Sequence, residues 1–564
     1  MINRKALFYS LGINIFFLML CLVFGNLRFG ANDDCFMAGI LTGAYGDEYN
    51  VHLTFVNALY GYCLLPLYHL IPSIQWYYIG EIFSIFISLF VASYIIIRKL
   101  GETWGMIFAT LLVALCANDY YIVVQFTQCA AMLSAVGMLC FIYGLEKWND
   151  SQKKSMMIIV LGILLMWWGS WMRWAAFLMG MPIFAGILLL HVKKFWQIKS
   201  VVLIALLIMF SGAFGFQKFN QSLYQSPDYK KYMDFQGPRS LLGDGQNYNQ
   251  QAVYEDLEEM GYSGKDYATL IEWTFYDPDV FAPESIRVVT DVIGRYFFKH
   301  NTQVLPSVIM RALSKSICRP IFIAWFLFSL ALFIFNPKKS LWTWVSLTIV
   351  IALIAHLLNL QRLVYRVETG LWLYATVLTV PLLKERFYIP RNISTGIVVT
   401  IALLNLFSYA TTGTQFRSPN GGELVIPETQ FVDTTDRKGF WTYVNSVPDS
   451  VVFLIEMNTY SGLIEKKNIP YLTDAKGSWE HLVSFGYWTP YFPDVENSLR
   501  KRGITNPMKD VVKENVLVVD EPTLVDYLER HYYKKVKVDT VRDFKGLTIY
   551  KYSLVTEIDA EEDQ

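Results

Sequence analysis

Long apolar stretches recur along most of the chain, with short polar stretches between them. Each is close to the ~17–25 residues that an α-helix needs to cross a bilayer. The pattern predicts a polytopic α-helical membrane protein with about eleven transmembrane helices. We expect these helices at residues 6–25, 76–97, 104–118, 123–145, 155–170, 175–190, 200–217, 317–335, 341–359, 370–383 and 392–410.

Positive charges distinguish the two sides of the predicted membrane domain. The short loops on one side hold fifteen Lys and Arg residues, and those on the other side hold Arg28, Arg173, Arg362 and Arg366. Cytoplasmic loops are enriched in Lys and Arg, so we expect a cytoplasmic N-terminus and an external C-terminus in the cytoplasmic membrane. Residues 49–71 are also apolar, but a span there would invert every later loop. We therefore expect a helix on the outer surface there.

Three polar parts lie on the predicted outer side: the first external loop at 26–75, an insertion at 219–316 and the C-terminal part. We expect a transmembrane domain over 1–410 that contains the first two, followed by a small soluble α/β domain over 411–564. Within them we predict a capping box at Ser263–Asp266, helices at Tyr267–Phe275, Pro283–Lys299 and Pro522–Arg530, and strands at Val451–Glu456, Val516–Asp520, Lys535–Thr540 and Leu547–Tyr552.

Composition agrees with this interpretation. Hydrophobic residues make up 54% of the chain and charged residues only 17%, against ~25% charged in ordinary globular proteins. The 48 Lys and Arg residues balance the 48 Asp and Glu residues, which excludes a general nucleic-acid binder because that would need a basic excess. The seven cysteines and seven histidines form no disulfide or metal-binding pattern.

Acidic residues gather just after the first predicted span. Asp33 and Asp34 come first, and Asp47, Glu48 and His52 follow as candidate substrate-binding residues. Ionisable groups at a membrane boundary are functional candidates. Two adjacent carboxylates repel each other, so one holds its proton more tightly, which suits a general base. Together with Asp47 they would also suit a divalent metal ion. The alternative is a solvated loop rich in turn-forming residues.

Three arginines on the predicted outer face are also candidates for substrate binding: Arg173, Arg362 and Arg366. Arg362 and Arg366 are four residues apart and would share one face of a helix. Two guanidinium groups there would bind a phosphate by paired hydrogen bonds. The alternative is an ion pair with Glu368, or aliphatic stems that lie along apolar surface.

Other ionisable residues receive simpler interpretations. Asp119 is expected in an external loop, while Glu81 and His356 are exceptions inside apolar runs. Acids that deprotonate an acceptor, with arginines that hold a phosphate leaving group, suit group transfer from a lipid phosphate at the membrane surface.

The order of these features resembles the GT-C superfamily of integral-membrane glycosyltransferases. Its members include protein O-mannosyltransferases, the oligosaccharyltransferase catalytic subunit and the lipid A aminoarabinose transferases. Their hallmark is an acidic pair in the first external loop followed by surface helices. Asn32-Asp33-Asp34 and the apolar stretch 49–71 occupy these places. The resemblance covers most of residues 1–410 and is greatest to bacterial multispanning members.

The resemblance implies an inverting transfer of a sugar from a polyprenyl-phosphate donor to a glycan, lipid or protein acceptor. Asp33 or Asp34 would be the general base, and Arg362 or Arg366 would bind the phosphate. The pair is D-D rather than D-E or D-x-D, which leaves the identity of the base open. No W-W-D-type signature follows, so a protein-glycosylating oligosaccharyltransferase is not expected.

Two other classes of function fit parts of the pattern. A polysaccharide polymerase or ligase would depend more on the 219–316 insertion and the arginines than on Asp33 and Asp34. A transporter or flippase of lipid-linked glycans would place charges at the bilayer midplane, on broken helices related by a repeat. The chain shows no internal repeat.

Overall fold

The computed structural model describes residues 3–243, 248–297, 305–413, 435–467 and 469–555. Two compact units divide the chain, and neither is continuous in sequence. The first contains Met1–Asp34, Val51–Asn220 and His300–Val425, and the second contains Cys35–Asn50, Gln221–Lys299 and Ile426–Gln564. The predicted boundary after residue 410 leads into residues 414–434, which lie outside the described residues.

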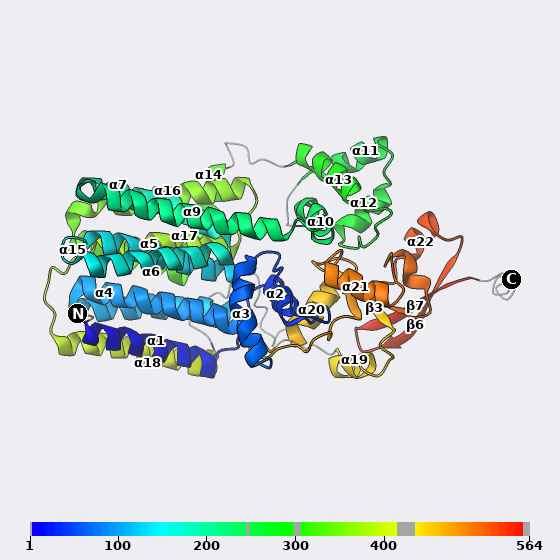
Figure 1. The fold of residues 1–564 in the computed structure, drawn as a ribbon, viewed down its shortest axis with the longest axis horizontal. Coiled ribbons are helices and arrows are strands. Elements are labelled where there is room, and N and C mark those ends of the chain that lie inside the picture. Colours follow the sequence, from blue (N-terminus) through cyan, green and yellow to red (C-terminus); the bar gives the residue numbers. More distant parts are fainter. Residues whose placement is uncertain (1–2, 244–247, 298–304, 414–434, 468, 556–564) are drawn as a thin grey trace. The chain divides into compact units, whose positions relative to one another are not determined.

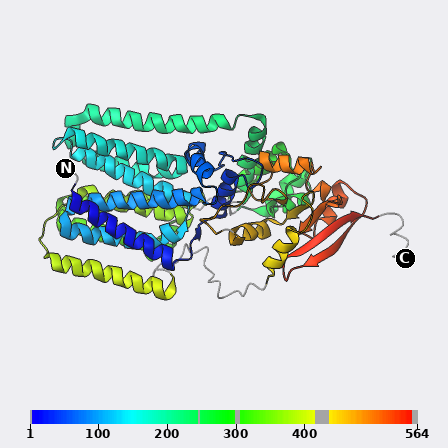
Figure 2. The same ribbon diagram turned by 60° about the horizontal axis from the view of Figure 1, so that its bottom comes forward.

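The first unit consists mainly of helices that run along or against one another (Figures 1 and 2). Its elements are α1 (Arg4–Phe24), β1 (Arg28–Phe29), α3 (Ala58–Leu70), α4 (Trp76–Ala117), β2 (Val123–Val124), α5 (Phe126–Glu146), α6 (Gln152–Met172), α7 (Trp174–Leu190), α8 (Val192–Phe195), α9 (Lys199–Leu223), α14 (Leu305–Ser316), α15 (Pro320–Phe335), α16 (Leu341–Asn359), α17 (Tyr365–Val377) and α18 (Arg391–Thr412). A further helix, α2 (Asn32–Thr42), begins in this unit and continues into the second.

Seven helical stretches in the described residues are long and apolar enough to cross a membrane. The pair α14 and α15 would make an eighth span, although it is bent by 88°. These helices define a polytopic α-helical membrane protein, as predicted. The seven include Trp76–Ile122 as one stretch, although the break at Gly101 lies between the predicted spans at 76–97 and 104–118. The predicted spans at 175–190 and 370–383 correspond to the shorter helices α7 and α17, and the number of eleven stays a prediction.

Helix α4 contains a break at Gly101 that separates the two predicted spans. The backbone there has φ 75° and ψ 177°, which side-chain-bearing residues rarely adopt. A Cβ atom at this position would also lie 2.6 Å from a carboxylate oxygen of Glu385. Glycine is therefore required both by the backbone conformation and by the contact.

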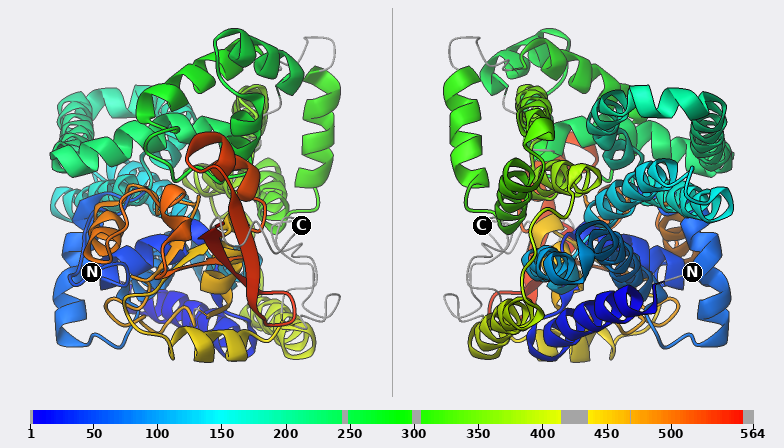
Figure 3. Two further views of the ribbon diagram at one scale, coloured as in Figure 1. Left: turned by 90° about the vertical axis from the view of Figure 1, so that its right-hand side faces the viewer. Right: turned by 90° about the vertical axis from the view of Figure 1, so that its left-hand side faces the viewer.

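Helix α5 forms the centre of the first unit. Its spanning window is fully buried, and it packs against α4, α6, α7 and α17. At Gly137 of α5 and Gly162 of α6, an added Cβ would lie 2.7 Å from the carbonyl oxygen of the other glycine. Small residues allow this close approach of two backbones. The right-hand view of Figure 3 shows these helices nearly end-on.

The predicted surface helix at 49–71 is helical only in its second part. Helix α3 begins after Asn57, whose side-chain oxygen accepts a hydrogen bond from the backbone N–H of Leu59 (3.0 Å). Residues 51–57 are irregular because this cap fixes the start of the helix. Its position on a membrane surface stays a prediction.

The second unit combines helices with a five-stranded mixed sheet (Figure 3, left). Its elements are α10 (Pro227–Gly243), α11 (Gln250–Glu259), α12 (Gly264–Ile271), α13 (Pro283–Arg295), α19 (Arg437–Val444), β3 (Val452–Ile455), α20 (Met457–Lys467), β4 (Leu482–Ser484), α21 (Pro493–Lys501), β5 (Val516–Val519), α22 (Val525–His531), β6 (Val536–Asp543) and β7 (Thr548–Leu554). The strand order is β4-β3-β5-β7-β6, with β3 parallel to β4 and β5, and β7 antiparallel to β5 and β6.

All four predicted strands of the C-terminal part and its predicted helix are present, as β3, β5, β6, β7 and α22. The capping box at Ser263–Asp266 was a wrong prediction. Helix α12 does begin after Ser263, but the Ser263 side chain makes no capping hydrogen bond. Its hydroxyl instead lies 3.3 Å from the guanidinium of Arg530, which donates to it. A tertiary contact has replaced the local one.

The second unit joins Gln221–Lys299, most of the predicted insertion, to the C-terminal part, although the two were predicted in different domains. Asp277 connects them: its buried carboxylate accepts hydrogen bonds from Tyr527 (2.7 Å), Tyr532 (2.6 Å) and the Asn506 side chain (2.8 Å). Residues 35–50 join the same unit because Asn50 donates a hydrogen bond to Asp494 (2.8 Å). Three distant segments therefore form one body.

Candidate functional site

The acid pair lies in the first turn of α2, where the helix N-terminus favours negative charge. Asp33 is partly exposed, whereas Asp34 is completely buried. One carboxylate oxygen of Asp34 accepts hydrogen bonds from the hydroxyl of Tyr77 (3.0 Å) and from the backbone N–H of Phe126 (3.3 Å). Burial, and after it the charge of Asp33, raise the pKa of the Asp34 carboxyl well above its usual range. Asp33 and Asp34 thus differ in environment, since solvent reaches only Asp33.

A third acid, Glu81 of α4, lies beside Asp34 and is also completely buried. The site prediction did not include it. Its sequence signal was present, because Glu81 is an acid inside an apolar run, and such residues are expensive to place in a membrane without a role. What the sequence did not contain was its partner, since Asp34 and Glu81 belong to different helices.

The segment between α4 and α5 connects several of the candidate residues. It starts with a π-helical turn, Asn118–Ile122, and then forms β2, which pairs in parallel with β1. Asp119 in this turn is buried, and the hydroxyl of Tyr365 donates a hydrogen bond to it. Asp119 is therefore part of a buried helical turn and not of a solvated loop, while its place on the outer side of the membrane stays a prediction.

Arg173 separates α6 from α7 in an extended conformation. Its guanidinium carbon lies 5.4 Å from the ring centre of Phe126 and 5.8 Å from that of Phe55. Both rings thus hold the guanidinium by cation–π contacts. Phe126 therefore contacts Asp34 through its backbone and Arg173 through its ring, which brings one predicted acid and one predicted arginine to the same residue.

The arginine loop, residues 361–366, does not continue a helix. Helix α16 ends at Asn359, and Gln361 has a positive φ of 55°, so the chain turns before Arg362. Arg366 lies in the first turn of α17. The expectation that the two arginines share a helix face was wrong, but both side chains are partly exposed. The contact of Tyr365 with Asp119 ties this loop to the segment before α5.

Glu368 pairs with Ser316 and Arg319, and not with the arginines of the loop as the alternative interpretation supposed. Its carboxylate accepts a hydrogen bond from Ser316 (2.5 Å) and lies 3.8 Å from the guanidinium of Arg319. The same guanidinium stacks on the ring of Tyr365 at 4.3 Å. Arg319 is thus a further cation next to the loop, and its contacts hold Tyr365 in place.

Asp47 and Glu48 belong to the second unit, whereas the residues described above belong to the first. Both are exposed, and they pair with Lys501 and with Lys476 (3.5 Å), respectively. The hydrogen bond from Lys501 lowers the pKa of Asp47. His52 is in the first unit, in the irregular stretch before α3, and is partly exposed. Of these predicted substrate contacts, only His52 therefore belongs to the same unit as the acid pair.

The residues that the structure describes contain no group of three or more His, Cys, Asp or Glu side chains placed to hold a metal ion. Of the suggested set, Asp33 and Asp34 lie in the first unit and Asp47 lies in the second, so a metal site formed by these three stays a prediction.

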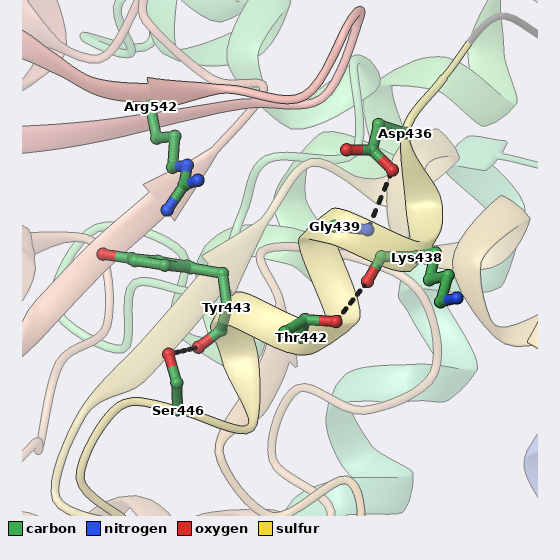
Figure 4. A pocket seen from close by; sticks show the side chains of 7 residues that line it. All are labelled: Asp436, Lys438, Gly439, Thr442, Tyr443, Ser446 and Arg542. Carbon is green, nitrogen blue, oxygen red and sulfur yellow. Dashed lines mark hydrogen bonds between the residues drawn. The ribbon is translucent and has the colours of Figure 1, made fainter.

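Two cavities differ sharply in their lining. In the first unit, α6 and α9 enclose an apolar groove of about 240 Å³, lined by residues such as Met156, Ile163, Trp167 and Ile208. In the second unit, a polar cavity of about 340 Å³ lies between α19 and β6 (Figure 4). The guanidinium of Arg542 lies over the ring of Tyr443 at 5.5 Å there.

Comparisons with known proteins add one similarity. No family model and no curated protein sequence matches the chain. Its structure is similar to the crystal structure of ArnT from Cupriavidus metallidurans in the apo state, with a TM-score of 0.41 and 9% sequence identity over 95% of each chain. Similarity at this level leaves the function to be inferred from the residues of the site.

Proposed function

We propose that this protein is a membrane glycosyltransferase of the GT-C type, which moves a sugar from a polyprenyl-phosphate carrier to a glycan, lipid or protein acceptor on the outer face of the cytoplasmic membrane. The observation that carries the proposal is the meeting of the acid pair and Arg173 at Phe126, within a unit of long apolar helices. An acid accepts the proton of an acceptor hydroxyl, and an arginine binds the phosphate of a lipid donor.

Asp33 is the proposed general base, because it is partly exposed while Asp34 is buried. Its carboxylate takes the proton of the acceptor hydroxyl as the acceptor oxygen forms a bond to the anomeric carbon of the sugar. The bond from that carbon to the phosphate oxygen breaks, and its electron pair stays on the phosphate. A single displacement of this kind inverts the anomeric configuration and leaves polyprenyl phosphate.

Arg173, Arg362 and Arg366 are the proposed phosphate-binding residues. Each has a partly exposed side chain. Arginine stays charged at all relevant pH values and forms paired hydrogen bonds with phosphate oxygens. The charge that develops on the leaving phosphate would be stabilised most strongly by guanidinium groups that are already held in place. The ring contacts of Arg173 supply such a constraint.

The groove between α6 and α9 suits part of the carrier's prenyl chain, because its lining is entirely apolar. Helix α6 continues from Trp167, at this groove, to Met172, and Arg173 follows directly. A carrier whose phosphate is bound by Arg173 could therefore place its chain along α6. Because the chain would exchange lipid contacts for protein contacts, the groove would orient the chain and add little hydrophobic free energy.

The test is a transfer assay in membranes supplied with a polyprenyl-phosphate-linked sugar. Asp33→Asn keeps the shape of the side chain and removes the base, so the rate should fall by ~10²–10⁴-fold, the usual contribution of a general base. The matched control is Asp449→Asn, which changes an exposed acid of the second unit. Transfer by Asp33→Asn at the rate of the control would reject the assignment of the base.

The product separates the proposed reaction from its alternatives. Addition of one sugar to each acceptor is expected, whereas a ladder of products would indicate a polymerase. Movement of the intact lipid-linked sugar across liposomes without any covalent product would indicate a flippase.

A further inference from the structure

Three oxygen atoms of the buried acids Asp34 and Glu81 lack a hydrogen-bond donor. They are the second carboxylate oxygen of Asp34 and both carboxylate oxygens of Glu81, each closed off from solvent, and no described N–H or O–H group donates to them. Buried carboxylate oxygens without donors are costly, because no hydrogen bond replaces their lost hydration. A proton bound by one of the two carboxyl groups would supply a donor to these oxygens.

The two carboxyl groups lie within hydrogen-bonding reach of each other. Two ionised carboxylates at this separation would repel strongly in an interior of low dielectric constant. A proton held between them removes this repulsion and supplies the missing donor at once. Carboxyl pairs of this kind titrate as a unit, and their last proton is shared by the two groups.

The surrounding donors decide which member is ionised. The hydroxyl of Tyr77 and the backbone N–H of Phe126 both donate to Asp34, and hydrogen bonds to a carboxylate favour its charged form. No such donor reaches the Glu81 side chain among the described residues. Ser84 and Cys129 are close to Glu81, but both donate to its backbone carbonyl oxygen.

We infer that Glu81 is protonated at neutral pH and donates a hydrogen bond to Asp34, so that it acts as a positioning residue for the acid pair at the head of α2. Its role in catalysis rests on the proposed function, but its protonation does not. The hydrogen bond from Glu81 completes the donors around Asp34 and fixes the first turn of α2. Asp33, the neighbouring residue, is thereby held in a defined orientation.

Infrared spectroscopy of the purified full-length protein tests the protonation without any substrate. At pH 7 the wild type should show the C=O stretching band of a protonated carboxyl, and Glu81→Gln should lose it. Glu146→Gln is the matched control, because Glu146 is also a largely buried helix residue but pairs with Lys99 at 2.8 Å and should be ionised. It should retain the band. Absence of the band from the wild type, or its persistence in Glu81→Gln, would overturn the inference.

Transfer assays then test the positioning role. Glu81→Gln keeps a neutral donor, so its rate should stay within about threefold of the wild type, whereas Glu81→Leu removes the donor and should lower the rate by about tenfold to hundredfold. Equal losses in the two variants would overturn the positioning role. If Asp33→Asn also transfers normally while the infrared band behaves as expected, then the proposed function fails and the protonation of Glu81 stands.

Discussion

The hydroxyl of Tyr365 donates a hydrogen bond to the carboxylate of Asp119, although the two residues are 246 positions apart in the sequence. This bond fixes the start of α17 to the turn that follows α4. Because Tyr365 lies between Arg362 and Arg366, the bond also limits where these two arginines can lie. The predicted phosphate-binding loop is thus held by a residue that was not itself predicted.

Tyr365→Phe should therefore destabilise the first unit. Asp119 is buried, and a buried carboxylate that loses a donor costs about 1–3 kcal/mol. Thermal unfolding in detergent should show a lower midpoint than the wild type. Tyr388→Phe is the control, because Tyr388 is 84% exposed and its hydroxyl should contribute little. An equal midpoint in both variants would show that the Asp119 contact has no energetic role.

Arg173→Ala should weaken the binding of the lipid donor. If the guanidinium binds the donor phosphate, its loss removes a charge-assisted hydrogen bond, and KM for the donor should rise by roughly tenfold or more. Arg173→Lys keeps the charge but not the paired hydrogen-bond geometry, so its KM should lie between the values for the wild type and Arg173→Ala. Arg386→Ala supplies the control, since Arg386 donates to the Ile334 carbonyl oxygen and lies on a different loop. A KM unchanged by Arg173→Ala would leave this arginine with a packing role alone.

Asp277→Ala should destabilise the second unit. The substitution leaves the hydroxyls of Tyr527 and Tyr532 and the amide of Asn506 without their buried acceptor. Loss of such a network costs on the order of 2–5 kcal/mol. Hydrogen exchange should become faster in both α12 and α22, while Asp449→Ala should leave it as in the wild type. Faster exchange in only one of the two helices would mean that Asp277 does not join the segments.

Asp494 should make the stability of the second unit depend on pH. Burial raises the pKa of Asp494, so the folded protein binds this proton more tightly than the unfolded chain does. Stability from this group is thus complete below the unfolded pKa, near 4, and is lost as pH rises through the folded pKa. Asp494→Asn cannot ionise and should lose less stability between pH 4 and pH 7. Parallel pH curves for the wild type and the variant would contradict this assignment.

The sequence pattern predicts the helices well, because a helix that crosses a membrane needs a long apolar run, whatever its neighbours are. The strands β3 and β5 also have a local sequence signal, since a short buried run between polar turns is sufficient to identify them. The helices α7 and α17 are shorter than the seven helical stretches that could cross a membrane, with 17 and 13 residues. Composition alone does not fix where such a helix stops.

The site could be predicted only in part, for a different reason. Asp33, Asp34 and Arg173 are visible in the sequence because they are charges next to apolar runs. Glu81 was noticed, but its meeting with Asp34 depends on how α2 and α4 pack. The turn at Gln361 that separates Arg362 from the helix is likewise set by the chain beyond α16. Contacts between residues of different helices depend on tertiary packing, and the spacing of residues along the sequence does not reveal them.

The bond between Asn50 and Asp494 spans 444 residues, and this has a consequence during biosynthesis. The ribosome will have passed most of the message before Asp494 emerges, while Asn50 follows the first helix by fewer than thirty residues. The nascent chain must therefore keep residues 35–50 without their final partners throughout the insertion of the helices. Until then this segment, whose residues 35–45 are mostly apolar and buried in the folded protein, depends on water or on a chaperone.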